Sequence, residues 1–247
     1  MLNEKELIRY DRQIMIFGKN AQEKLKKAKV ATVGIGGLGS AISIYLTAAG
    51  VGHLLLIDEQ KPELSNLNRQ ILYGEEDVEK RAKTISAKEK LNQLNSEVKI
   101  ETYSKRISRE NIEDLLDDVD IVVDALDNFE TRYLLNEFCV KGRMPLVHAA
   151  VEGFHGQITT IIPGKTPCLR CLFPNPPREI KFPIIGVTAG FFGILEANEV
   201  LKLITGYGNN LIGKLFIYDL SRNEGEWIDI RPNPSCPLCS NLHISEY

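Results

Sequence analysis

The 247-residue sequence predicts an α/β protein with a mainly parallel sheet that antiparallel strands extend. Three observations carry this prediction. Strand-like and helical segments alternate as far as residue 150, which is typical of a parallel sheet covered by helices. After His155 strand-like segments follow one another with only one long helical pattern among them. Two Cys-x-x-Cys pairs in the C-terminal half predict, in addition, a structural zinc site.

Each element is assigned from its hydrophobic period and its flanking turn residues. The predicted strands are 30–33, 53–57, 98–102, 121–123, 146–150, 157–162, 215–218 and 226–230. The predicted helices are 4–16, 21–27, one between the first two strands, 79–94, 108–115, 129–141 and 187–204. The proline-dense residues 173–183 are predicted to form a crossing loop.

We predict a single domain over residues 1–247, because no linker, repeat or low-complexity tract divides the chain. Within it, residues 1–28 form an N-terminal helical arm and residues 29–152 a nucleotide-binding half. Residues 153–247 form a second half, which contains both cysteine pairs.

The composition excludes several classes of protein. A net charge of −3 gives no broad attraction for nucleic acid or an anionic membrane. The N-terminus is polar, unlike a secretory signal, and the longest apolar run, 183–195, is too short to span a bilayer. We therefore expect a soluble cytoplasmic protein with neither nucleic acid nor membrane as a partner.

A glycine-rich loop follows the first strand, in the order that nucleotide-binding βαβ units require. Gly34 permits the turn, Gly36 lets backbone N–H groups approach a phosphate, and Gly39 lets the next helix pack against the strand. The start of that helix presents free N–H groups to an anion. Asp58 ends the second strand, where a carboxylate binds ribose hydroxyls. The segment predicts a Rossmann-like nucleotide site.

Four of the five cysteines form the two Cys-x-x-Cys pairs, Cys168 with Cys171 and Cys236 with Cys239. Four thiolates in two such pairs suit a closed tetrahedral Zn²⁺ site, which is structural because it leaves no position for substrate. Two redox dithiols or reduced surface thiols are the alternatives. The fifth, Cys139, is interpreted as a small buried apolar side chain.

Three cations accompany the glycine loop. Arg69 lies among small polar residues, Lys83 opens a helix, and Arg12 precedes the first strand. Each could be an ordinary surface cation. Together with the loop they indicate a triphosphate, whose charge needs cationic side chains.

Two acids, Asp124 and Asp127, follow the fourth strand at the sheet edge where ligands of α/β proteins bind. A carboxylate at this edge can hold Mg²⁺ on the phosphates. The alternative is that Asp127, followed by Asn128, only caps a helix.

These motifs, taken in order, resemble the MoeB/ThiF/HesA family of adenylyltransferases, bacterial relatives of the ubiquitin-activating enzyme. The resemblance covers residues 7 to 240 and rests on the segments 9–13, 34–39, 64–70 and 124–128 and on both cysteine pairs. It implies a ThiF-type adenylation domain that uses ATP and Mg²⁺ to adenylate the C-terminal Gly-Gly carboxylate of a ubiquitin-like sulfur-carrier protein. Residues 153–247 would bind the carrier.

The resemblance also implies roles for individual residues. It places Asp58 on ribose, Arg69 and Lys83 on phosphates, Asp127 on Mg²⁺, and Arg12 on the ATP of the other subunit of a homodimer. The implied catalytic residues are Arg12, Arg69, Lys83 and Asp127. The implied nucleotide-binding residues are Gly34, Gly36, Gly37, Gly39, Asp58, Asn66, Arg69, Lys83, Asp127 and Asn128.

Two positions depart from the family pattern. Many relatives have a cysteine at the position aligned with Gly186, and no cysteine lies between Cys171 and Cys236. We therefore predict an enzyme that stops at the acyl-adenylate. Gln60 replaces a common aspartate, which puts a second acidic contact in that loop in doubt. The resemblance leaves open whether the carrier serves molybdopterin or thiamin synthesis.

Two other functions remain possible on the sequence. A nicotinamide-dependent oxidoreductase would use the glycine loop and Asp58, but it gives no role to Arg69, Asp127 or the cysteine pairs. A non-catalytic nucleotide- and carrier-binding subunit would not need the four implied catalytic residues.

Overall fold

The computed structural model describes residues 1–175 and 182–242. Its strands form one sheet in the order β3-β2-β1-β4-β5-β6-β7-β8. The parallel part comprises β1 (Lys29–Val33), β2 (His53–Ile57), β3 (Lys99–Tyr103), β4 (Ile121–Asp124) and β5 (Leu146–Glu152). Antiparallel pairing then adds β6 (His155–Ile161), β7 (Lys214–Asp219) and β8 (Glu224–Asp229). The predicted parallel sheet with an antiparallel extension is confirmed.

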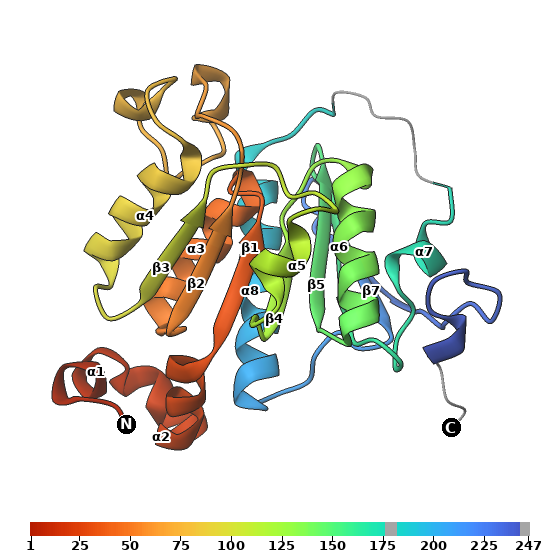
Figure 1. Cartoon of the computed structure of the whole chain (residues 1–247), viewed down its shortest axis with the longest axis horizontal. Helices are drawn as coiled ribbons and strands as arrows, with labels where there is room; N and C mark the ends of the chain where they lie inside the picture. Colours follow the sequence, from red (N-terminus) through yellow and green to blue (C-terminus); the bar gives the residue numbers. More distant parts are fainter. Residues whose placement is uncertain (176–181, 243–247) are drawn as a thin grey trace.

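Helices cover both faces of the parallel strands (Figure 1). One face packs against α3 (Gly37–Ala49), α4 (Lys83–Leu94) and α8 (Gly186–Thr205). The other packs against α5 (Ile112–Leu116), α6 (Phe129–Gly142) and the short α7 (Leu169–Leu172). The first two helices, α1 (Glu4–Arg9) and α2 (Asp11–Lys27), lie beyond the amino ends of the strands, at the bottom of Figure 1.

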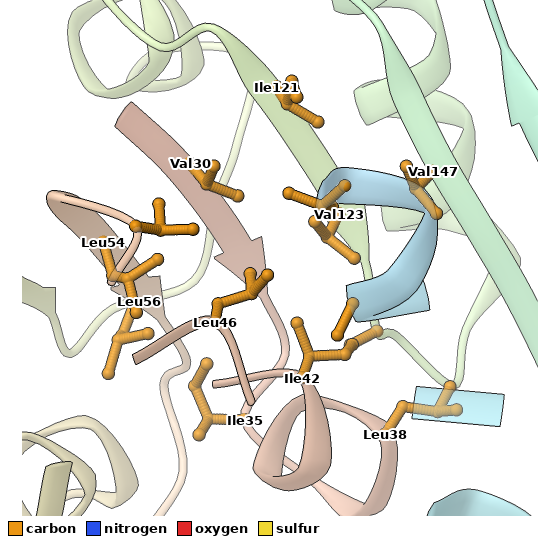
Figure 2. Close-up of a cluster of buried hydrophobic side chains, with 14 of the residues drawn as sticks. Val30, Ile35, Leu38, Ile42, Leu46, Leu54, Leu56, Ile121, Val123 and Val147 are labelled. Atoms are coloured by element: carbon orange, nitrogen blue, oxygen red, sulfur yellow. The ribbon is translucent and has the colours of Figure 1, made fainter. Parts of the chain in front are cut away.

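The core explains why the central strands are apolar without interruption. In Figure 2, Val30, Val123 and Val147 come from three neighbouring strands and face Ile42 and Leu46 of α3. Alternate residues of the same strands, such as Ala31 and Val122, point to the other face and pack in a second apolar cluster. A strand with helices on both faces therefore has no polar side. Because both faces are covered, the loops that follow β1 and β4 emerge at the edge of the sheet formed by the carboxyl ends of these strands.

The antiparallel extension begins at a tight turn between β5 and β6. Gly153 has φ of 57°, and its N–H donates to the Pro183 carbonyl at 2.7 Å. Ile184 forms a β-bridge with Gly153, so the chain that leads into α8 returns to this turn. Of the predicted crossing loop at 173–183, residues 176–181 lie outside the described residues.

Several element boundaries differ from the prediction. The predicted helix 4–16 is helical but divided in two, because α1 ends at Arg9, Tyr10 interrupts the helix, and α2 begins at Asp11. Gly18 (φ 82°) then kinks α2 between the predicted helices 4–16 and 21–27. The helix predicted from residue 79 starts at Lys83, because Glu79 has φ of 55°. The helix α7 was not predicted. None of the helices in the described ranges is long and apolar enough to cross a membrane.

Candidate active site

A groove of about 1010 Å³ runs along the carboxyl ends of the central strands and on to β6 and β7. It collects most of the residues that the sequence singled out: Gly34, Gly36, Gly37, Asp58, Arg69, Lys83, Asp127 and Asn128. Gly39, Asn66 and Arg12 do not line it. The Asn66 side chain instead accepts the Glu63 N–H at 3.1 Å and so holds the turn that leads to Arg69.

The glycine loop has the geometry of an anion site. Gly34 has φ of 91°, which a residue with a side chain rarely adopts. A Cβ at Gly39 would lie 2.0 Å from the Gly34 carbonyl oxygen, so only glycine permits α3 to start this close to β1. The N-cap of α3, Gly36, makes no side-chain hydrogen bond, which leaves first-turn N–H groups of the helix for a ligand.

Asp58 joins the ends of β1 and β2. Its two carboxylate oxygens accept the N–H groups of Ile35 and Gln60, both at 2.8 Å. The carboxylate therefore lies beside the glycine loop and lines the groove. Its remaining lone pairs can accept ribose hydroxyls.

Lys83 is the most deeply buried cation of the groove, with only 2% of its surface exposed. Its Nζ donates to Gln60 Oε1 at 2.7 Å, so the residue that replaces the common aspartate is a neutral partner. Burial lowers the pKa of Lys83, and the charges of Asp58 and Asp127 oppose this shift. The ammonium group thus lies within the influence of both acids of the site and lines the groove, where it can meet a phosphate.

Arg69 lines the same groove, beside Gly37 of the glycine loop. Its Nη1 donates to the Ser65 carbonyl at 2.8 Å and to Asn68 Oδ1 at 3.1 Å. These bonds leave other guanidinium donors for an anion. The first turn of α8 supports the Arg69 backbone, because a Cβ on Gly186 would lie 2.5 Å from the Asn68 carbonyl. Position 186 is therefore a close backbone contact with no room for a side chain.

The two acids after β4 occupy different environments. Asp124 is fully buried, and its Oδ2 accepts from His148 Nδ1 at 2.7 Å. Asp127 is exposed in the groove, and no side chain in the described part of the chain pairs with it. The helix cap is Asn128, whose Oδ1 accepts the Thr131 N–H at 2.9 Å. Asp127 is thus not a cap and remains available to a cation.

Arg12 lies far from the groove of its own chain. Its neighbours Tyr10 and Gln13 contact the C-terminal end of α3, where Gln13 donates to the Ala49 carbonyl at 2.7 Å and a Cβ on Gly50 would meet the Tyr10 ring. The glycine loop is at the other end of this 13-residue helix, about 20 Å away at 1.5 Å per residue. Arg12 is exposed.

The four paired cysteines come together at the edge of the molecule. Their sulfur atoms all lie within 4.8 Å of one another, with Cys168 3.7 Å from Cys236 and Cys171 3.3 Å from Cys239. A tetrahedral zinc ion with four sulfur ligands would need separations of about 3.8 Å. The hydrogen bond between Cys168 and Cys171 lowers the pKa of Cys171 and raises that of Cys168. The donor set and its spacing fit Zn²⁺.

This cluster fastens the C-terminal tail to α6 through α7. The Leu169 N–H donates to Asn136 Oδ1 at 2.9 Å, and the Arg170 guanidinium lies 4.4 Å from the centre of the Tyr133 ring. Cys139, the fifth cysteine, is fully buried on the same helix, and burial raises its pKa. Its interpretation as a buried apolar side chain agrees with this environment.

The sequence did not reveal several residues of the site. Arg132 (5% exposed) and His148 lie behind Asp127 and form a buried charged network with Asp124. Lys105 and Arg106 line the groove beyond Asp58. Arg132 comes four residues after Asn128, about one helical turn further along the predicted helix. This spacing was the one signal in the sequence that Arg132 lies near the segment with Asp127.

Comparison with known proteins identifies the family. Residues 10–238 match the ThiF family. The chain belongs to the ThiF family. A HesA protein from Trichormus variabilis is 40% identical and covers 97% of this chain and 91% of its own length. A Thermus thermophilus protein named sulfur carrier protein adenylyltransferase is 41% identical and covers 96% and 92%. A Haloferax volcanii protein named SAMP-activating enzyme E1 is 39% identical and covers 96% and 90%.

Solved structures agree with this assignment. A crystal structure of E. coli MccB with MccA-N7isoASN has a TM-score of 0.86 at 27% identity and covers 97% of this chain and 76% of that one. MccB with ATP has a TM-score of 0.85 at 28% identity and covers 94% and 75%. The chain is an adenylyltransferase of the ThiF family, and the predicted family and reaction type are confirmed.

Proposed function

We propose that this enzyme uses Mg·ATP to adenylate the C-terminal Gly-Gly carboxylate of a ubiquitin-like sulfur-carrier protein of the MoaD or ThiS type. The observation that carries the proposal is the single groove, which joins an anion site to the antiparallel strands. At one end lie the glycine loop, Arg69 and Lys83; at the other lie Gln157 and Ile217. A triphosphate and an extended peptide tail can thus meet in one space. The relative named for sulfur-carrier adenylation supports this choice of acceptor.

The chemistry needs charge compensation more than proton transfer. An oxygen of the carrier carboxylate forms a bond to the α-phosphorus, and the bond from that phosphorus to the β-phosphate bridging oxygen breaks to release pyrophosphate. The nucleophile is already ionised at neutral pH, so no general base is required. Arg69 and Lys83 offset the repulsion between the two anions and the charge on pyrophosphate. Mg²⁺, when bound through Asp127, would supply further neutralisation of the phosphates.

The position of Arg12 supports a homodimer with two composite sites. Within one chain, α2 lies at the opposite end of α3 from the glycine loop (Figure 1). A role for Arg12 at a phosphate therefore requires the arm of a second subunit. Closed homodimers are the commonest assembly among soluble oligomers.

The reaction is proposed to stop at the carrier adenylate, without a thioester. At position 186 the close approach to the Asn68 carbonyl leaves no room for a reactive side chain. The only cysteine outside the proposed zinc set, Cys139, is buried on α6, on the far side of the sheet from α8. The four clustered cysteines are proposed to hold a structural Zn²⁺.

ATP–pyrophosphate exchange tests this function. Exchange should require Mg²⁺ and a carrier that ends in Gly-Gly, and a carrier with a bulky terminal residue should lose exchange more than it loses binding. Exchange without any carrier, or binding of NAD with hydride transfer, would contradict the proposal. Nucleotide and carrier binding without exchange would indicate the non-catalytic subunit instead.

A further inference from the structure

A buried charged network lies directly behind the exposed acid of the groove. Asp124 on β4, His148 on β5 and Arg132 on α6 are respectively 0%, 1% and 5% exposed. Asp124 Oδ2 accepts from His148 Nδ1 at 2.7 Å and lies 3.6 Å from Arg132 Nε. Three elements thus contribute one polar side chain each to a single cluster.

The hydrogen bonds of this network converge on the peptide groups just before Asp127. Asp124 Oδ1 accepts the Leu126 N–H at 3.2 Å, and Arg132 Nη2 donates to the Leu126 carbonyl. The same Nη2 donates to the Ala149 carbonyl of β5 at 3.1 Å. Both polar groups of Leu126 are therefore fixed to side chains that the sheet and α6 hold in place.

The residue after Asp127 is fixed as well, because Asn128 caps α6. The backbone is thereby held on both sides of Asp127, while the Asp127 carboxylate has no side-chain partner in the described ranges 1–175 and 182–242. The Asp127 carboxylate thus stands on a fixed backbone and is open to the groove, an arrangement suited to binding a cation there. Such preorganisation is what a metal ligand requires of its surroundings.

The network keeps its charges in the interior. Burial raises the pKa of Asp124, but the Arg132 charge and the His148 hydrogen bond outweigh burial, and the net pKa is lowered. Burial lowers the pKa of His148, which favours a neutral imidazole that donates from Nδ1. A buried ion pair is rarely more stabilising than apolar side chains of the same volume. The hydrogen bonds from the network to the backbone before Asp127 therefore explain its presence better than a contribution to stability does.

We propose that Arg132, Asp124 and His148 are positioning residues that hold the Asp127 loop and so set the affinity of the groove for the divalent cation of a nucleotide complex. This inference rests on the proposed function only in taking Asp127 as the cation ligand. The three residues act through Asp127 and touch neither cation nor nucleotide. The competing interpretation is that Arg132, which also lines the groove, contacts a phosphate directly.

The test measures binding of a fluorescent, non-hydrolysable ATP analogue to the intact protein, without Mg²⁺ and over a Mg²⁺ titration. Arg132→Lys keeps the positive charge but loses the hydrogen bonds from Nη2 to the Leu126 and Ala149 carbonyls. It should raise the half-saturating Mg²⁺ concentration about 10-fold, as loss of an outer partner of a metal ligand does. Affinity for the analogue without Mg²⁺ should change less than about twofold, well below the effect on Mg²⁺.

A second pair of variants carries the test if Arg132→Lys does not fold. His148→Leu removes the donor to Asp124 and should raise the Mg²⁺ requirement, whereas His148→Asn retains a donor near Nδ1 and should restore most of it. Glu137→Gln is the matched control, because Glu137 lies on the same helix and pairs with Arg109 and Lys141 at the surface. It should bind as wild type does.

A double-mutant cycle decides whether the network acts through Asp127. Asp127→Ala should raise the Mg²⁺ requirement by itself, and Arg132→Lys should then add nothing further. Additive effects, an unchanged Mg²⁺ requirement, or equal loss of binding without Mg²⁺ would each overturn the inference. The readout is binding, so a protein that binds Mg·nucleotide normally but fails in exchange contradicts only the proposed function.

Discussion

The groove and the cysteine cluster are both sets of polar groups from distant parts of the chain, yet they are built in opposite ways. In the groove, Asp127 is exposed and has no side-chain partner among residues 1–175 and 182–242, and Lys83 donates to a neutral amide. In the cluster, the four sulfur atoms face one another, and Cys168, Cys236 and Cys239 are at most 2% exposed. The groove leaves its charges available to a ligand, whereas the cluster satisfies its own members around one point. Substitutions in the groove should therefore affect activity, and substitutions in the cluster should affect stability.

The largest expected effect is that of Asp127→Ala. Pyrophosphate exchange should fall by about 100-fold or more, the size of effect seen when one preorganised charge-stabilising group is removed. The melting temperature should stay near that of wild type, since Asn128 and not Asp127 caps α6. Exchange assays and thermal unfolding measure the two quantities. Retention of most of the exchange activity would remove Asp127 from the mechanism.

The second prediction concerns Arg12, which does not line the groove of its own chain. Arg12→Ala subunits mixed with Asp127→Ala subunits should form a heterodimer with one intact composite site and about half of wild-type activity, because each site takes one residue from each subunit. Exchange by a tag-purified heterodimer measures this.

The reverse arrangement is the control. A heterodimer of a wild-type subunit with an Arg12→Ala/Asp127→Ala subunit should be inactive if Arg12 acts across the interface. Activity in this heterodimer, together with none in the first, would place Arg12 in its own chain's site.

The third prediction concerns the closed cluster. The purified protein should contain about one zinc per chain. Cys171→Ser or Cys239→Ser should lose the metal and several kcal/mol of unfolding free energy, since metal binding contributes directly to folding. Nucleotide affinity should change far less. The matched control is Cys139→Ala, which removes a buried thiol outside the cluster and should leave zinc content unchanged. Metal-free protein of unchanged stability would refute the zinc site.

The smallest expected effect lies in the core, at Glu196 of α8. This carboxyl is 0% exposed and has no side-chain partner in the described ranges. Burial raises its pKa well above the ordinary value, Asp124 adds to the shift, and Arg132 opposes it. Because the folded-state pKa is raised, the native state binds this proton more tightly than the unfolded chain. The associated stability is complete below about pH 4 and is lost as pH rises toward the folded-state pKa.

Glu196→Gln should therefore be more stable than wild type at pH 8, and the difference should grow with pH by at most about 1.4 kcal/mol per unit. Denaturant unfolding at several pH values measures it. Glu199→Gln is the control on the same helix. Glu199 is also buried but accepts from Thr160 Oγ1 at 2.5 Å and the Leu211 N–H at 2.8 Å, so its substitution should destabilise. A pH-independent difference between wild type and Glu196→Gln would show that Glu196 is charged in the fold.

The sequence predicted the parts of this molecule that local pattern determines. The βαβ unit from β1 to Asp58 follows from an apolar run, glycines at fixed spacing and an acid at the second strand end, all within 30 residues of chain. The spacing within the two cysteine pairs predicted that all four cysteines lie together in the fold, as they do. Helix boundaries failed where packing overrides propensity, as at Tyr10, whose ring is buried against Gly50 and whose hydroxyl accepts from Asn95 at 2.9 Å.

The buried network escaped prediction for a different reason. Asp124 and Asp127 are equivalent in sequence, since both are acids after the same strand. Only the register of β4 against β5, which pairs Asp124 with His148, separates the buried acid from the exposed one. The same holds for Arg12: its distance from the groove depends on which end of α3 the N-terminal arm contacts.

Intact-mass spectrometry of the carrier tests the central claim most directly. The protein, Mg·ATP and a Gly-Gly carrier are incubated with inorganic pyrophosphatase, and the reaction is analysed without thiol reductant. The account predicts a carrier that gains one AMP at its C-terminal carboxylate, an Asp127→Ala protein that produces none, and no covalent link between carrier and enzyme. An obligatory enzyme–carrier adduct traced to a cysteine of this chain, or a carrier that binds and stays unmodified, would contradict it.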